Sequence, residues 1–328
     1  MNPAAVRRIL LLVASSSIVL GFVACRREPG PVTRPASAAA SGAASVAWPA
    51  AASFPESASA SAPATGAPDD RMESLMEGAF PDWHVDAPQV WFLPKEDPKE
   101  PGTVPVVLAP ELVVDIDETH RVLVVRGTIS DEDGHVGGGH AQPGNLGAYW
   151  FERRDDRWFV TRRRDSILWT GFMGEVGTVK PLELGGAHHA VSIENGSCWQ
   201  GFCADYLGVA ELDASGARVV VDGLRVATTS TGAKAGCADV LAGKQPGPHD
   251  APDEPGPDDC FDIEGQWRIE PRADGERGDL VVAYSGTQLV PDSDNGGNKP
   301  KAVDQTLVLR YAQGAYKAAS GTNPTHDF

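Results

Sequence analysis

The chain of 328 residues is long enough for one to three domains, and its 22% of charged residues suits a soluble body. Residues 1–68 carry five arginines and two glutamates, so the remainder accounts for a net charge of −20 within the total of −17. An acidic body repels phosphate backbones, which excludes nucleic acid as a partner. The 36 glycines and 26 prolines disfavour long helices and favour strands joined by turns.

The first 24 residues are organised like a signal peptide. Arg7 and Arg8 precede an apolar run over Ile9–Val23, and the small Ala24 follows it. This run is shorter than the roughly 20 residues that a helix needs to span a bilayer. A short apolar run behind basic residues therefore predicts export and cleavage rather than a transmembrane helix.

The stretch Phe22–Cys25 resembles the lipobox of bacterial lipoproteins. In that family the cysteine thiol receives a diacylglyceryl group, the chain is cut before the cysteine, and the new amine is acylated. The resemblance implies that Cys25 is lipidated and that a lipid bilayer is its partner. The family's signal for retention at the inner membrane is an aspartate after the cysteine, so Arg26 implies the outer membrane. The body is then expected in the periplasm or at the cell surface.

Two segments are expected between the lipid anchor and the folded body. Residues 25–68 are almost all Ala, Ser, Pro and Gly, which bury too little apolar surface to fold, so a disordered tether is predicted. Residues 69–110 are expected to hold a short helix over Arg71–Ala79, capped by Asp70. A proline-rich extended strap, anchored by Trp91, follows the helix.

Residues 111–328 are predicted to form a mostly β domain, because their apolar runs are short, β-branched and bounded by Gly, Asp and Asn. Three stretches share one layout of a strand, a long loop and a tight hairpin. The recurrence favours bladed, propeller-like units, and a β-sandwich is the alternative. The layout loosely resembles the FG-GAP-type bladed repeats of integrins. The three stretches are residues 122–162, 187–221 and 279–319.

Four cysteines follow Cys25, and four thiols in an exported chain favour two disulfides. Of the three pairings, nearest neighbours are preferred, which gives Cys198–Cys203 and Cys237–Cys260. In the chain-entropy model the first disulfide contributes about 2 kcal/mol and the second, which closes a longer loop, about 3 kcal/mol.

A glycine-rich segment carries residue types that bind metal ions. Asp131, Asp133, His135 and His140 lie within ten residues, and the glycines between them allow the backbone to approach an ion closely. The alternative is a flexible, solvated acidic loop.

A second segment resembles the start of a calcium loop. Asp292, Asp294 and Asn298 offer oxygen ligands around a glycine turn. The distal glutamate of an EF-hand is missing at the usual spacing, so a solvated hairpin loop is the alternative. Calcium is the one candidate cofactor that the sequence suggests.

The sequence contains no nucleophile elbow, phosphate-binding loop, dinucleotide fingerprint or His-Glu-x-x-His motif. The leading interpretation is a membrane-anchored, non-enzymatic envelope lipoprotein whose body binds an envelope protein, a glycan or a cation. One alternative is a periplasmic hydrolase with dispersed acids, in which Asp131, Asp133 and His135 would act. Another alternative is a structural subunit of an envelope complex.

Overall fold

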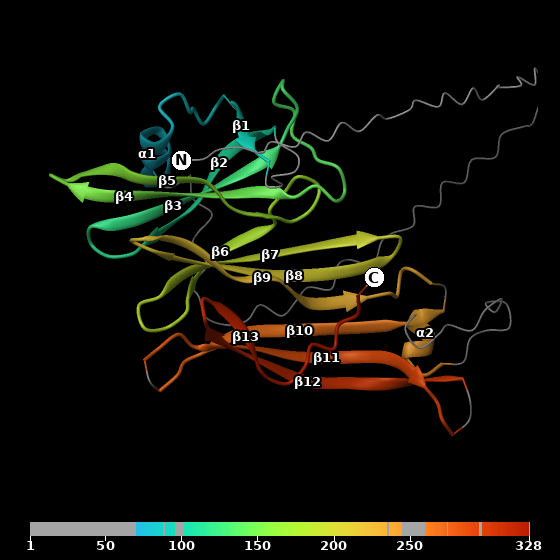
Figure 1. Ribbon diagram of the computed structural model, residues 1–328. Coiled ribbons are helices and arrows are strands. Elements are labelled where there is room, and N and C mark those ends of the chain that lie inside the picture. Colours follow the sequence, from blue (N-terminus) through green and yellow to red (C-terminus); the bar gives the residue numbers. More distant parts are fainter. Residues whose placement is uncertain are drawn as a thin grey trace, which may run out of the picture. The chain divides into compact units, whose positions relative to one another are not determined.

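The computed structural model describes residues 70–87, 89–95, 102–234, 236–244, 260–273, 275–294 and 297–327, which belong to one compact unit (Figure 1). The expected signal peptide, the lipidated Cys25 and the expected tether over residues 25–68 lie outside the described residues. Within the described part of the chain, no helix is long and apolar enough to cross a membrane.

The described residues form a mostly β structure of two antiparallel sheets, which confirms the predicted fold class. The two helices are short, with α1 at Asp70–Ala79 and α2 at Cys237–Leu241. The five-stranded sheet contains β1 (Val90–Pro94), β2 (Thr103–Asp115), β3 (His120–Ile129), β4 (Gly144–Arg154) and β5 (Arg157–Thr170). The eight-stranded sheet contains β6 (Thr178–Glu183), β7 (His189–Trp199), β8 (Phe202–Asp213), β9 (Gly216–Thr229), β10 (Phe261–Glu270), β11 (Asp279–Pro291), β12 (Asn298–Ala312) and β13 (Ala315–Ser320).

Each sheet is a meander in which every strand pairs with its neighbours in the chain. The three predicted hairpin turns are present, between β4 and β5, β8 and β9, and β12 and β13. The three recurring stretches of the sequence do not form separate blades, because their strands are hydrogen-bonded to the other strands of the two sheets. In the second stretch, residues 187–221, a long loop is expected between the first strand and the hairpin. The structure has a tight β7–β8 turn there, because the pairing of β7 and β8 continues to Trp199 and Phe202.

The β structure begins before residue 111. The segment expected to be an extended strap supplies β1 and the first half of β2, which pair with each other from Val90 and Val107 to Pro94 and Thr103. Pro94 is tolerated because β1 is the edge strand of its sheet, and Pro110 lies at the bulge where the register of β2 and β3 shifts. Helix α1 is present at the predicted place, and its buried residues Leu75 and Met76 pack on the five-stranded sheet.

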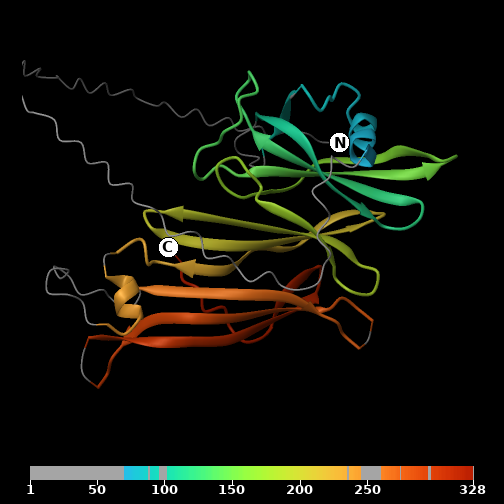
Figure 2. The same cartoon turned by 180° about the vertical axis from the view of Figure 1, so that it is seen from behind.

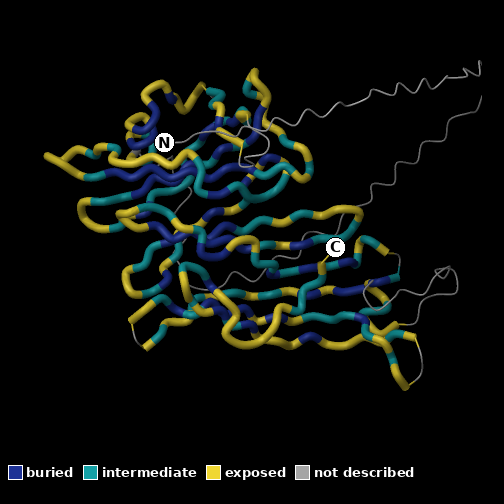
Figure 3. Tube along the Cα trace, viewed as in Figure 1, coloured by how far each residue is buried: buried dark blue, intermediate teal, exposed yellow. Residues whose placement is uncertain are grey.

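Three apolar cores lie on the faces of the sheets. The first lies between α1 and one face of the five-stranded sheet, and contains Phe80, Trp83 and Tyr149. The second joins the other face of that sheet to β6, β7 and β8, and contains Trp150 and Ile193. Figure 3 shows the buried residues in the middle of the strands and the exposed ones toward the hairpin ends.

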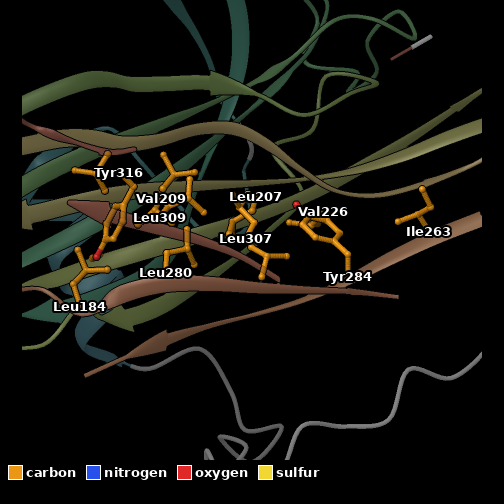
Figure 4. Close-up of a cluster of buried hydrophobic side chains, with 14 of the residues drawn as sticks. Leu184, Leu207, Val209, Val226, Ile263, Leu280, Tyr284, Leu307, Leu309 and Tyr316 are labelled. Atoms are coloured by element: carbon orange, nitrogen blue, oxygen red, sulfur yellow. The ribbon is translucent and has the colours of Figure 1, made fainter. Parts of the chain in front are cut away.

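The third core fills the concave side of the eight-stranded sheet, which curls into a half-barrel. Figure 4 shows side chains from β8, β11 and β12 meeting there, among them Leu207, Leu280 and Leu307. The register of β8 and β9 shifts at three places, and such bulges bend and twist a sheet. The pairing between β9 and β10 covers only Ala227–Thr229, and the sheet divides at that point.

Both predicted disulfides are present. Cys198 and Cys203 face each other across the β7–β8 ladder, and Cys237 at the start of α2 is joined to Cys260 before β10. Cys237 and Cys260 are fully buried and pack with Leu289. The second disulfide therefore fixes α2 to the base of β10 and β11.

A buried ion network ties the two halves of the curled sheet together. The Glu211 side chain on β8 is 4% exposed, and its Oε1 accepts bonds from Arg277 Nε at 2.9 Å and Arg277 Nη2 at 2.6 Å. His188 Nδ1 lies 2.9 Å from the same oxygen. Arg277 belongs to the β10–β11 connection, so this contact holds that connection against β8.

We predict that Glu211→Ala lowers the free energy of unfolding by about 3 kcal/mol, because it leaves the Arg277 guanidinium without its carboxylate. The double variant Glu211→Leu with Arg277→Met should lose less, because no charge is then left unpaired. Urea unfolding measures both. The control is Glu270→Ala, which breaks an exposed pair with Arg268 and should cost under about 1 kcal/mol. Equal losses for the Glu211 and Glu270 variants would contradict this account.

Candidate functional site: an exposed loop face

Three of the exposed large apolar side chains lie on connections that meet. Val136 is in the β3–β4 loop, Met173 is in the β5–β6 loop, and Trp199 is the last residue of β7, beside the β7–β8 turn; they are 59%, 54% and 58% exposed. We call these three residues, together with His140, the loop face. Exposed apolar side chains are common singly, but a group on neighbouring loops indicates a contact surface.

Backbone hydrogen bonds join the first two loops. Gly138 N donates to Met173 O at 3.0 Å, and Met173 N donates to His140 O at 3.3 Å. A Cβ atom on Gly138 would lie 2.5 Å from Gly174 N, so only glycine permits this approach. Val136 lies two residues before Gly138, on the loop that these bonds hold against the turn of Met173.

His140 joins these loops to the β7–β8 hairpin. Its Nε2 lies 2.9 Å from Cys198 O, and because a carbonyl only accepts, Nε2 carries the proton and donates. Ser197 Oγ lies 3.2 Å from the same nitrogen. The His140 ring also contacts the Trp199 ring, with centroids 4.8 Å apart. His140 thus positions the exposed indole.

The turn that follows Trp199 is rigid for two further reasons. The Cys198–Cys203 disulfide closes the hairpin directly behind the turn. Gly201 has φ 87°, and a Cβ there would lie 2.1 Å from Gly232 O, so the turn is pressed against the loop after β9. Trp199 is therefore presented on a fixed support rather than on a mobile loop.

Met173 is held in a strained backbone conformation. It has φ 58°, in the left-handed region, and occupies the first position of a two-residue turn between Phe172 and Glu175. Asn or Gly is usual at that position. A non-glycine residue there costs about 1 kcal/mol, and such strain is concentrated at functional sites.

The structure brings together three of the four metal-ligand candidates of the β3–β4 loop. Ligand atoms of Asp131, Asp133 and His135 lie within 4.8 Å of one another, and all three residues are exposed. His140 is not among them, because its ring bonds to the β7–β8 hairpin.

Hydrogen bonds within the loop engage Asp131. Its Oδ1 accepts bonds from His135 N at 2.9 Å and Asp133 N at 3.0 Å, and its Oδ2 lies 3.0 Å from His135 Nδ1. The bond from the His135 backbone is the main cause that lowers the pKa of Asp131 below its usual value. A cation would have to replace the contact between His135 and Asp131.

The second candidate loop holds a lysine among its acids. Lys299 Nζ lies 2.9 Å from Asp292 Oδ1 and 3.9 Å from Asp294 Oδ2. Asn298 is the first residue of β12. The ammonium group supplies at these carboxylates the positive charge that calcium would bring.

Sequence reasoning identified His140 but missed its partners Met173 and Trp199. The sequence does contain a signal for Trp199, because Gln200 and Gly201 lie between Cys198 and Cys203 in a spacing that fits a two-residue hairpin turn.

Comparisons of the chain with protein-family models, curated proteins and solved structures found no match.

We predict that Met173→Asn raises the free energy of unfolding by about 1 kcal/mol, because asparagine tolerates the left-handed conformation. Chemical denaturation measures the change. The control is Val136→Asn, which also replaces an exposed apolar residue but at a position without a positive φ. A loss of stability in Met173→Asn would show that the side chain, rather than the backbone, dominates at this position.

Proposed function

We propose that the chain is a lipid-anchored envelope lipoprotein that acts as a binding or accessory module, with the loop face as its contact surface. The observation that carries the proposal is the exposure of Trp199 at 58% on a support fixed by a disulfide and by His140. Binding surfaces concentrate their energy in a few rigid aromatic side chains, and tryptophan leads among them. A rigid anchor loses little conformational entropy when it binds.

The charge around the loop face favours a partner protein over the bilayer itself. Asp131, Glu132 and Asp133 are exposed in the same β3–β4 loop that carries Val136. Three acids would be repelled by an anionic lipid surface and attracted to basic side chains. The proposed partner is therefore an envelope protein that presents apolar residues flanked by lysine or arginine.

The hydrolase alternative gains little from the same loop. Both oxygens of Asp131 accept hydrogen bonds from the turn that it closes. A general acid or base needs a free oxygen directed at a substrate. The geometry thus favours a structural role for this carboxylate.

The lipid anchor predicts a specific mature N-terminus. Mass spectrometry of the native protein should find Cys25 as the first residue, carrying a diacylglyceryl group and an acylated amine. Cys25→Ser should move the protein from the membrane fraction to the soluble fraction, and Ser45→Ala should leave it in the membrane. An unmodified thiol at position 25, or an intact leader, would contradict the anchor.

The loop face predicts a selective loss of binding. A protein that co-purifies with the chain from detergent-solubilised membranes should be lost with Trp199→Ser, because the central apolar contact is removed. It should be retained with Phe159→Ser, which removes an exposed aromatic residue on β5. Retention of every co-purifying protein by Trp199→Ser would contradict the loop face as the contact surface.

A further inference from the structure

The two disulfides of the described chain differ in their access to solvent. Cys198 is exposed and Cys203 is half-buried. Cys237 and Cys260 are fully buried and pack with Leu289. Exchange between thiols and disulfides requires a thiolate to reach a disulfide sulfur, so access decides which disulfide reacts. In the folded protein a reductant can therefore reach the Cys198–Cys203 disulfide, whereas the other disulfide is closed to it.

The exposed disulfide lies near the end of a hairpin. Cys198 and Cys203 are opposite each other in the β7–β8 ladder, and one further pair, Trp199 and Phe202, separates them from the turn. Figures 1 and 2 show from two sides that this turn lies at an outer end of the eight-stranded sheet. A second protein can therefore approach the disulfide from beyond the end of the sheet.

The hairpin holds the two cysteines opposite each other without help from the disulfide. Every residue of β7, from His189 to Trp199, pairs with β8. The turn is also packed against the loop after β9 through Gly201. The Cα atoms of Cys198 and Cys203 lie 4.0 Å apart. The reduced thiols would therefore stay within reach of each other, and the disulfide could form again without refolding of the chain.

The disulfide restrains the residue on which the loop face depends. Trp199 follows Cys198 directly and is 58% exposed. Two contacts fix Cys198, which are the bond from His140 to its carbonyl and the disulfide at its side chain. Reduction removes the second contact, and a hairpin end without its covalent closure has more open conformations available. The indole is then presented by a support that opens more often.

We propose that the Cys198–Cys203 disulfide is a reversible exchange site for a protein dithiol, and that its reduction weakens binding at the loop face. The effect on binding rests on the proposed function, whereas the exchange reaction does not. Exposed disulfides are the labile and regulatory ones, and disulfides that resist reduction are structural. The chain thus combines one disulfide that holds the fold with one that sets the state of its contact surface.

The reaction is a thiol–disulfide exchange in two steps. A thiolate of the dithiol attacks Sγ of Cys198, the more exposed of the two cysteines, which forms a mixed disulfide and releases Cys203 as a thiolate. The second thiolate of the dithiol then attacks the dithiol's own sulfur in the mixed disulfide and releases Cys198 as a thiolate. Two electrons pass from the dithiol, which becomes a disulfide, to the chain. The two cysteine thiolates take up the two protons that the dithiol gave to the solvent.

The exchange site is tested on the full mature chain in detergent, without denaturant, with dithiothreitol as the probe. Free thiols are trapped with iodoacetamide at successive times and located by peptide mass spectrometry. Cys198 and Cys203 should be alkylated about tenfold faster than Cys237 and Cys260, or more, because access limits the reaction. Alkylation of all four at one rate, or of none before denaturant is added, would overturn the exchange site.

Hydrogen exchange measures the consequence for the hairpin end. In dithiothreitol, exchange over Trp199–Ala204 should rise about tenfold while β4 stays unchanged, because only the short loop loses its closure. The matched control is the double variant Cys198→Ser with Cys203→Ser, which should show the faster exchange with and without the reductant. Unchanged exchange at the hairpin end of the reduced wild-type chain would overturn the control of Trp199.

Binding separates this inference from the proposed function. A protein whose co-purification requires Trp199 should be recovered severalfold less in dithiothreitol. The double serine variant should give that lower recovery with and without the reductant. Equal recovery by the wild-type chain and the double variant would overturn redox control of the loop face. If Trp199→Ser loses no partner, the proposed function fails, and the alkylation and hydrogen-exchange measurements still decide whether the disulfide is an exchange site.

Discussion

The burial of β7 and β8 on both faces is the constraint on which the rest of the structure depends. Ala190 and Leu207 face the concave core of the curled sheet, whereas Ile193 and Ala210 face the five-stranded sheet. Each strand therefore contributes to two cores at once. Removing either core would expose apolar surface in the parts of these strands where both faces are buried, so the two sheets stabilise each other.

The loop face depends on this shared layer. Its residues come from connections of both sheets, and they can meet only because the β5–β6 connection passes from one sheet to the other beside β7. The β3–β4 loop reaches the β7–β8 hairpin through His140.

The sequence predicted the fold class, α1, three hairpin turns and both disulfides, because each has a local signal such as turn residues or cysteine spacing. The prediction missed β6 and also β10, although apolar and polar residues alternate in β10 from Phe261 to Glu270, and it placed the start of the sheet too late. Strand β4 is buried over Gly144–Phe151 without alternation, so its prediction depended on a short apolar run and the turn after it rather than on a period of two. The loop face depends on contacts over long sequence separations, such as His140 to Cys198, and no local pattern encodes these.

The shared layer is tested most directly by hydrogen exchange in a variant of β7. Ile193→Ala removes a fully buried side chain from the core between the sheets and leaves the concave core intact. If the sheets stabilise each other, exchange should rise together in β4 of the five-stranded sheet and in β7. A rise confined to β7 and its neighbours β6 and β8, with β4 unchanged, would contradict the account.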